Sequence, residues 1–267
     1  MPAFVFTAPS GAQLHGGRQG EGMPLLALHG GYSSRGEIEA ILDLVLPAAP
    51  AFERWTPDLP GMGDSIRTSV DSAEEVADLL CAFIAAEFRG RPFVVLGHSL
   101  GGFLARAVAA RMPDQVRAVA LLCTLPADLR PEPVSVVEAE DGALDALSER
   151  ERGEFEGYFV WHTAEAVARF RDGVAGSLDR YDADIVGRIM ESADFDVGHG
   201  ADDLPTLLML GRRDSLIGYR SQVAAAEAWG RASVVIVDDA GHALPHEKPD
   251  LVRMLLSDLF RRAGLVA

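Results

Sequence analysis

The stretch from Phe93 to Gly102 places a serine where it could act as a nucleophile. Four apolar residues run into a turn in which Ser99 lies between Gly97 and Gly101, and an alanine-rich amphipathic segment follows. Glycines on both sides allow a tight bend and close packing of a strand against a helix. The pattern predicts a strand, a sharp turn that presents the Ser99 hydroxyl, and a helix. A phosphate-binding turn is the alternative, but no Gly-x-x-x-x-Gly-Lys-Ser/Thr pattern is present and no basic residue adjoins Ser99.

Two further residues could activate this serine. A serine hydroxyl is a weak nucleophile near neutral pH, so it needs a general base and an acid that orients the base. His242 follows the last apolar segment of the chain, and Asp214 follows the apolar segment before it. Because the carboxyl ends of parallel strands meet at one edge of a sheet, we expect Ser99, Asp214 and His242 to lie together there.

Other residues near these positions offer alternative chemistry. Asp128 follows the apolar segment that ends at Cys123 and could supply the acid in place of Asp214. His246 lies four residues after His242, a spacing that could bind a metal ion, but Pro245 disfavours the regular helix that such a pair would use. We therefore expect neither a metal site nor a cofactor.

Apolar strand segments alternate with helical segments over most of the chain. The expected strands are residues 4–6, 13–15, 24–29, 52–56, 93–96, 116–123, 205–210 and 233–237, and the expected helices are residues 37–46, 73–88, 99–111, 222–229 and 248–262. Ser72 and Glu75 predict a capping box at the start of the second helix. The first two strands surround a Pro-Ser-Gly turn, which is typical of an edge hairpin. The other strands are apolar throughout, which indicates a mainly parallel sheet with helices on both faces, an α/β fold.

The alternation stops between about residues 126 and 200. Apolar residues there recur at roughly helical intervals: Leu144, Leu147, Phe155, Phe159, Val167 and Phe170. We expect a core domain formed by residues 1–125 and 201–267, with residues 126–200 inserted as a helical cap. The aromatic residues Tyr158, Phe159 and Trp161 either form the core of this cap or line the roof of an apolar pocket.

Composition limits the possible partners. The chain has 267 residues, of which 48% are hydrophobic, and a formal charge of -16. This charge repels phosphate backbones and anionic lipid surfaces, so we expect a small-molecule substrate and neither a nucleic acid nor a membrane. The first residues lack the basic and apolar regions of a signal peptide, and no apolar run approaches a membrane span. The sequence therefore predicts a cytoplasmic protein, either a monomer or a homodimer.

Five short motifs, in this order, resemble those of α/β-hydrolase-fold enzymes with a helical cap inserted after the sixth strand. They are His29-Gly30-Gly31, Asp58-Leu59-Pro60-Gly61-Met62-Gly63-Asp64-Ser65, Gly97-His98-Ser99-Leu100-Gly101-Gly102, Gly211-Arg212-Arg213-Asp214, and Gly241-His242 followed by Glu247-Lys248-Pro249. The resemblance covers nearly the whole chain. It implies an α/β-hydrolase fold with Ser99 as nucleophile, Asp214 as acid and His242 as base.

The resemblance also implies an oxyanion hole made of two backbone N–H groups. One belongs to Leu100, and the other comes from the His-Gly-Gly loop, with Gly31 as the first candidate and Tyr32 as the second. His29 is expected to hold the turn of this loop by a hydrogen bond. The predicted substrate-binding residues are Tyr32, His98, Tyr158, Phe159 and Trp161.

The same triad serves several reactions, so the fold alone does not set the substrate. Esterases and lactonases with a Gly-His-Ser-x-Gly-Gly motif are the most similar group, which predicts a serine hydrolase of small to medium, partly apolar esters or lactones. A C–C bond hydrolase, an aminopeptidase or amidase, and a non-catalytic ligand sensor are the alternatives. C–C hydrolases commonly carry Asn where His98 stands, and proline iminopeptidases usually continue the glycine motif with Pro-Gly, whereas this chain has Tyr32 and Ser33.

Overall fold

An eight-stranded sheet forms the centre of the computed structural model, which describes residues 2–126 and 128–266. Met1, Ala127, which falls within the predicted insertion, and Ala267 lie outside the described residues. The strand order is β1-β2-β4-β3-β5-β6-β9-β10. The strands are β1 (Ala3–Thr7), β2 (Gln13–Gln19), β3 (Met23–Leu28), β4 (Phe52–Pro57), β5 (Phe93–His98), β6 (Val116–Leu122), β9 (Thr206–Gly211) and β10 (Ala232–Val237). Only β2 pairs antiparallel, with β1 and with β4, and the remaining neighbours in this sheet are parallel.

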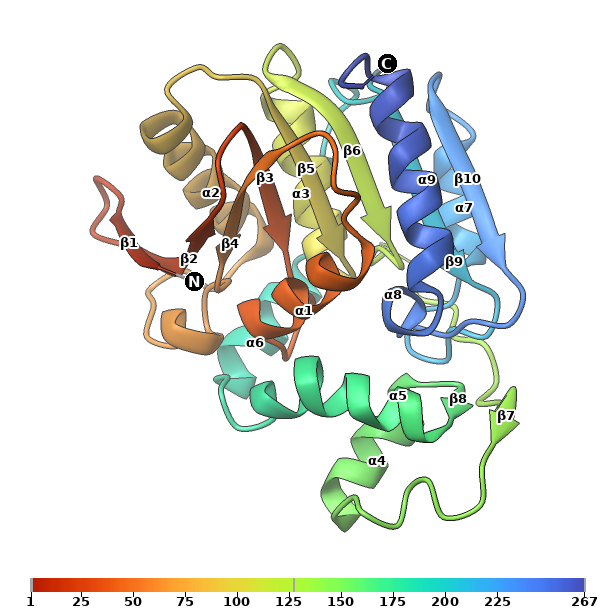
Figure 1. Ribbon diagram of the computed structural model, residues 1–267. Coiled ribbons are helices and arrows are strands. Elements are labelled where there is room, and N and C mark those ends of the chain that lie inside the picture. The colour runs from red at the N-terminus through yellow and green to blue at the C-terminus, as the bar shows by residue number, and fades with distance from the viewer. Residues whose placement is uncertain (1, 127, 267) are drawn as a thin grey trace.

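Helices cover both faces of this sheet (Figure 1). Those on one face are α2 (Ala73–Phe88), α3 (Leu100–Arg111) and α7 (Arg220–Ala226), and those on the other are α1 (Arg35–Val45) and α9 (Pro249–Arg262). Short helices also form at η1 (Gly63–Ser65) and α8 (Leu244–Glu247). The predicted mainly parallel α/β fold is therefore confirmed.

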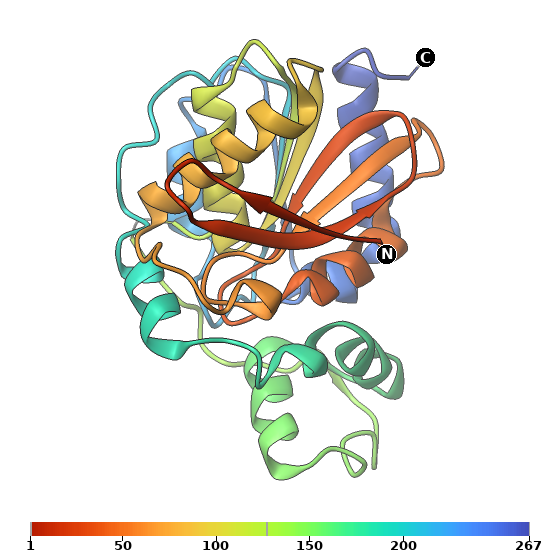
Figure 2. The same ribbon diagram turned by 90° about the vertical axis from the view of Figure 1, so that its left-hand side faces the viewer.

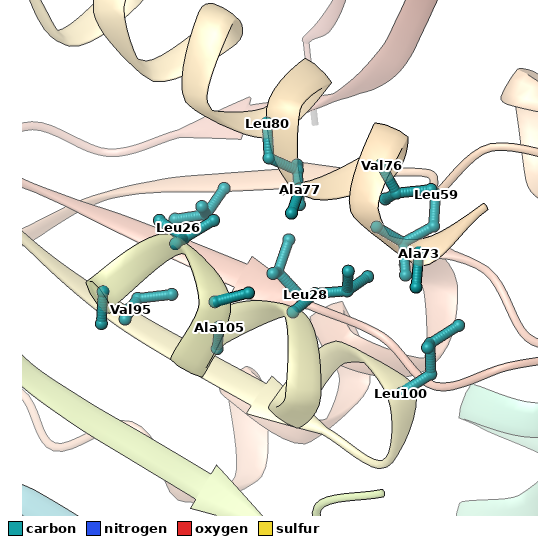
Figure 3. Packing of buried hydrophobic residues seen from close by; sticks show 14 of the residues in the cluster. Leu26, Leu28, Leu59, Ala73, Val76, Ala77, Leu80, Val95, Leu100 and Ala105 are labelled. Carbon is teal, nitrogen blue, oxygen red and sulfur yellow. The ribbon is translucent and has the colours of Figure 1, made fainter. Parts of the chain in front are cut away.

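The apolar strands bury side chains on both faces. In β3, Leu26 and Leu28 belong to the cluster under α2 and α3, whereas Leu25 and Ala27 belong to the cluster under α1 and α9. Figure 3 shows the first of these clusters, in which side chains of α2 and α3 pack onto β3 and β5. Because successive residues of a strand point to opposite faces, a strand covered on both sides must be apolar at every position.

The structure corrects several local expectations. The helix predicted at residues 222–229 is α7, which starts at Arg220 and ends at Ala226. β2 extends to Gln19, beyond the predicted residues 13–15, because its second half pairs with β4. The Ser72 hydroxyl accepts a hydrogen bond from the Glu75 N–H, but the Glu75 carboxylate accepts the N–H of Asp71 rather than that of Ser72. Ser72 thus caps α2 as predicted. The second hydrogen bond of the predicted capping box, from the Ser72 N–H to the Glu75 carboxylate, is replaced by one from the Asp71 N–H.

The segment after β6 lies across the carboxyl ends of the parallel strands (Figures 1 and 2). It contains β7 (Glu138–Ala139), α4 (Glu149–Tyr158), β8 (Trp161–His162), α5 (Ala164–Arg169), η2 (Phe170–Val174), η3 (Ala175–Ser177) and α6 (Ala183–Glu191). We call it the cap segment. Apolar residues of α4, α5 and η2 form a cluster separate from the two that flank the sheet, and the six residues that recur in the sequence at helical intervals all belong to this cluster or pack against it. Val186 and Ile189 of α6 instead belong to the cluster under α2 and α3. In the described residues, no helix has both the length and the apolar character required to cross a lipid bilayer.

Candidate active site

Ser99 lies at the sharp turn between β5 and α3. Its backbone angles, φ 53° and ψ -121°, fall outside the regions that side-chain-bearing residues commonly adopt. A side-chain carbon at Gly97 would collide with the carbonyl oxygen of Gly101, and one at Gly101 would collide with that of Leu28. Glycines at these two positions therefore let α3 start directly against β5 and β3. Strained backbone of this kind costs about 1–3 kcal/mol and is held by the surrounding packing.

His242 and Asp214 form a buried hydrogen-bonded pair. The distance between His242 Nδ1 and Asp214 Oδ2 is 2.7 Å. Asp214 follows β9 and His242 follows β10, so the ends of two neighbouring parallel strands position the pair. Ser99 and His242 line one cavity, and Asp214 lies behind His242 with an exposed fraction of 1%.

The second oxygen of Asp214 is also fully used. Oδ1 accepts the N–H groups of Leu216 and Ile217, each at 3.0 Å. Burial alone would raise the pKa of Asp214, but His242 and these N–H groups stabilise the carboxylate, so the pKa lies below its ordinary value. Asp128, the alternative acid, is exposed and pairs with Arg130 instead.

The His-Gly-Gly loop contacts the serine turn. A side-chain carbon on Gly30 would lie 3.2 Å from Ser99 Cβ. His29 donates from Nδ1 to the carbonyl oxygen of Gly30, at 2.7 Å, and its Nε2 accepts the N–H of Leu59 at 2.9 Å. The prediction that His29 holds this turn is confirmed. Gly31 and Tyr32 line the same cavity as Ser99, and Leu100 is the first residue of α3, where N–H groups lack partners within the helix.

His98 packs against the catalytic histidine candidate. Its ring centroid is 4.9 Å from that of His242, and its Nε2 donates to the His242 carbonyl oxygen at 3.1 Å. Burial and the neighbouring His242 lower the pKa of His98 to about 4. His98 is therefore neutral near pH 7 and fixes the main chain of the His242 loop.

Glu247 connects this loop to the cap segment. Its Oε2 accepts the Gly241 N–H at 2.9 Å, and its Oε1 accepts the N–H groups of Val160 and Trp161 at 2.6 and 3.3 Å. Burial raises the pKa of Glu247, and these three N–H groups oppose that effect. The Glu247 carboxylate thus holds two segments in place, namely Gly241, which precedes His242, and the start of strand β8.

The cavity at Ser99 has a volume of about 430 Å³, within the range of small-molecule sites. Of the predicted binding residues, Tyr32, His98 and Tyr158 line it. Phe159 and Trp161 do not, so the structure places these two predicted binding residues outside the cavity. Phe159 is buried in the apolar cluster of the cap segment, whereas Trp161 donates from Nε1 to the Asp239 carbonyl oxygen and packs under Lys248.

Within the described part of the chain, one group of side chains has donor atoms close enough to share a metal ion. Ligand atoms of His98, Cys123 and His242 lie within 4.8 Å of one another. Their hydrogen bonds direct them elsewhere, since His242 Nδ1 faces Asp214 and His98 Nε2 faces a carbonyl oxygen. Burial also raises the pKa of the Cys123 thiol well above its usual value, which opposes the thiolate that a metal requires.

Sequence reasoning missed most of the cavity wall. The apolar residues that line it come from four separate regions: Leu125, Leu129, Val174, Leu178, Met190, Leu216 and Ile217. It also missed Glu37, which is 3% exposed and lines the same cavity. One signal could have identified Glu37, because it shares the buried face of α1 with Ile38 and Ile41. A carboxylate on the apolar face of a helix suggests a site.

Known proteins resemble this chain over most of its length. A model of the alpha/beta hydrolase family matches residues 25–254. The pimeloyl-[acyl-carrier protein] methyl ester esterase of Chromobacterium violaceum is 30% identical over 235 residues, which covers 87% of this chain and 85% of that protein. The crystal structure of an alpha/beta superfamily hydrolase from Oenococcus oeni PSU-1 has a TM-score of 0.86 at 22% identity and covers 98% of this chain and 99% of that chain. A thermophilic esterase from Thermogutta terrifontis has a TM-score of 0.70 at 20% identity, with the same two coverages. The family model, the relative named as an esterase and the fold shared with the solved structures agree with the motifs and with the geometry of the site. The chain therefore belongs to the α/β hydrolase family.

Proposed function

We propose that this protein hydrolyses carboxylic esters or lactones through an acyl-enzyme formed on Ser99. The observation that carries the proposal is the His242–Asp214 hydrogen bond beside a strained serine turn, with Ser99 and His242 in one cavity. Proteins with similar sequences are named as a methyl ester esterase and as an esterase/lipase.

The proposed reaction begins with attack of Ser99 Oγ on the ester carbonyl carbon. His242 Nε2 accepts the Ser99 proton, since Asp214 holds the Nδ1–H tautomer and leaves Nε2 free. The bond to the alcohol oxygen then breaks, and His242 returns the proton to that oxygen. A water molecule attacks the acyl-enzyme, gives one proton to His242, and releases the acid as the proton returns to Ser99.

Negative charge develops on the carbonyl oxygen during both attacks. We propose the backbone N–H groups of Leu100 and Gly31 as its donors, with Tyr32 as the alternative to Gly31. Leu100 supports this role because it starts α3, where the N–H groups and the helix dipole favour a negative charge. Removal of one such donor from an oxyanion hole typically reduces kcat by about 10²–10³.

We propose a substrate of small to medium size with an apolar portion. A cavity of about 430 Å³ with a largely apolar wall fits such a molecule. Methyl esters are the first class to test, because several relatives are named for the hydrolysis of a methyl ester.

The test combines covalent labelling with turnover. A fluorophosphonate should add once to the intact protein, as seen by mass spectrometry, and Ser99→Ala should lose both the adduct and the hydrolysis of methyl and p-nitrophenyl esters. Ser34→Ala is the matched control, since Ser34 precedes α1 and its buried hydroxyl bonds that of Ser177 and does not line the cavity. An adduct that persists in Ser99→Ala would contradict the assignment of the nucleophile.

The same assay separates this proposal from its alternatives. A ligand sensor would release no more than one equivalent of product per protein molecule. A C–C hydrolase or an amidase would prefer diketones or amides to esters of the same size. Steady release of alcohol from esters, at a rate above those with matched amides and diketones, is the expected result.

A further inference from the structure

Glu37 brings a buried carboxylate into the cavity that holds Ser99. It lies in the first turn of α1 and is 3% exposed. The Ser33 hydroxyl donates to Glu37 Oε2, and the Tyr158 hydroxyl donates to Oε1. His246 Nε2 lies 3.5 Å from the same Oε1. Tyr158 belongs to the cap segment and His246 to α8, so three separate parts of the fold meet at this side chain.

This carboxylate is ionised near neutral pH. Burial alone would raise its pKa, but the neighbouring His246 ring and the Ser33 hydroxyl keep the pKa of Glu37 well below the usual range. Its place in the first turn of a helix also favours a negative charge. Both hydroxyl partners act as donors, which is the arrangement that an ionised carboxylate requires.

The described residues of the cavity wall offer this charge no permanently positive partner. Among the described residues, those that line the cavity include no lysine and no arginine. His98 is neutral because its pKa is about 4. Glu154, an exposed residue of α4, adds a second carboxylate to the wall.

Glu37 keeps capacity for one more donor. A carboxylate offers about four lone-pair positions, and Ser33, Tyr158 and His246 account for at most three. An ammonium group supplies both the missing donor and the opposite charge. A carboxylate group would instead lose its hydration and meet a like charge in a site of low polarity.

We propose that Glu37 determines specificity, and that the cavity prefers esters bearing a primary ammonium group over matched esters bearing a carboxylate. This inference rests on the proposed ester hydrolysis and adds the charge class of the substrate. The apolar wall would hold the chain that connects the ester to the ammonium group, while Glu37 receives the charged end.

Three methyl esters of similar length test the proposal. Methyl 6-aminohexanoate ends in an ammonium group, methyl heptanoate in a methyl group, and monomethyl pimelate in a carboxylate. The expected order of kcat/KM follows that sequence, with a ratio of at least about 100 between the first and the last. Equal or better hydrolysis of the carboxylate ester by the wild-type protein would overturn the inference.

Substitution of the carboxylate assigns the effect to Glu37. Glu37→Gln should reduce the ammonium-to-carboxylate ratio at least about tenfold, because the amide keeps the shape and loses the charge. Glu39→Gln is the matched control, since Glu39 belongs to the same helix and does not line the cavity, and it should keep the wild-type ratio. An unchanged ratio in Glu37→Gln would show that another group selects charge.

A binding measurement tests the inference even if Glu37→Gln fails to fold or the protein hydrolyses none of these esters. Ser99→Ala should gain thermal stability with hexylammonium and gain less or nothing with hexanoate at the same concentration. The preference for hexylammonium depends on the charge of the cavity and does not depend on turnover. The measurement therefore separates failure of the inference from failure of the proposed hydrolysis. Stronger stabilisation by hexanoate would overturn the inference.

Discussion

His98 is a single side chain whose ionisation differs between the folded and unfolded protein. Its pKa falls from about 6.5 to about 4 on burial beside His242. The unfolded chain therefore binds more protons than the folded chain between these two pH values, and the free energy of unfolding must decrease as the pH falls from 6.5 toward 4.

The corresponding prediction concerns His98→Gln, which keeps an N–H donor for the His242 carbonyl oxygen but cannot be protonated. Protonation of His98 should lower the free energy of unfolding of the wild-type protein by about 2 kcal/mol between about pH 7 and about pH 5. The variant should lose correspondingly less, as measured by urea unfolding at the two pH values. His162→Gln is the control, because His162 lies in β8 and directs its Nε2 to the Phe159 carbonyl oxygen rather than to the His242 loop. Equal pH dependence in the wild type and His98→Gln would contradict the assignment.

Asp214 provides the second prediction at this scale. If it orients His242, Asp214→Asn should reduce kcat by about 10⁴, since the amide favours the wrong imidazole tautomer. Asp128→Asn should change kcat by less than about twofold, because Asp128 is exposed and paired with Arg130. Steady-state kinetics with one ester measures both. A larger loss in Asp128→Asn would reassign the acid.

Between elements, Glu247 links the His242 loop to the cap segment. Glu247→Ala leaves the N–H groups of Gly241, Val160 and Trp161 without their acceptor. Each unsatisfied buried donor costs about 1–3 kcal/mol, so the variant should unfold at a clearly lower temperature and also lose kcat. Glu227→Ala, at the end of α7, is the control and should change neither quantity. An unchanged melting temperature in Glu247→Ala would contradict the role of this contact.

The cap segment combines a structural cluster with a wall of the cavity, and two variants separate these parts. Phe159→Ala removes a fully buried ring and should destabilise the protein by about 3–5 kcal/mol, with little change in preference among acyl lengths. Met190→Ala enlarges the cavity beside Gly31 and should shift kcat/KM toward bulkier acyl groups by about tenfold. Melting temperatures and an ester series measure the two effects. A shifted acyl preference in Phe159→Ala alone would reverse the assignment.

The whole molecule carries a formal charge of -16, which should attract cations over distances longer than a single contact. For methyl 6-aminohexanoate we expect kcat/KM to fall several-fold between low salt and about 1 M salt, because the screening length shrinks to about 3 Å. The neutral methyl heptanoate should show no comparable decrease. If both esters respond equally to salt, the decrease has a cause other than charge attraction.

The sheet and the candidate catalytic residues at the carboxyl ends of its strands were predictable from the sequence, because both produce local sequence patterns. Continuous apolar runs such as Leu25–Leu28 identify strands covered on both faces, and the helices between them require a parallel sheet. Glycines around Ser99 mark the turn. Ser99, Asp214 and His242 each follow an apolar strand segment, which predicts that they lie at the same edge of the sheet. The bounds of several elements differed, by most at the carboxyl ends of β2 and α7, and the capping partner of Glu75 also differed.

The tertiary structure decided what the cavity contains. Tyr158 and Glu37 are 121 residues apart in the chain, and no local pattern predicts that their side chains meet. Tyr158 and Phe159 are neighbours in the sequence, yet one lines the cavity and the other fills the cluster of the cap segment. Patterns along the chain identify elements because they reflect the periodicity of a helix or a strand. The wall of the cavity depends on how elements from distant parts of the chain pack together, and only the folded structure contains that arrangement.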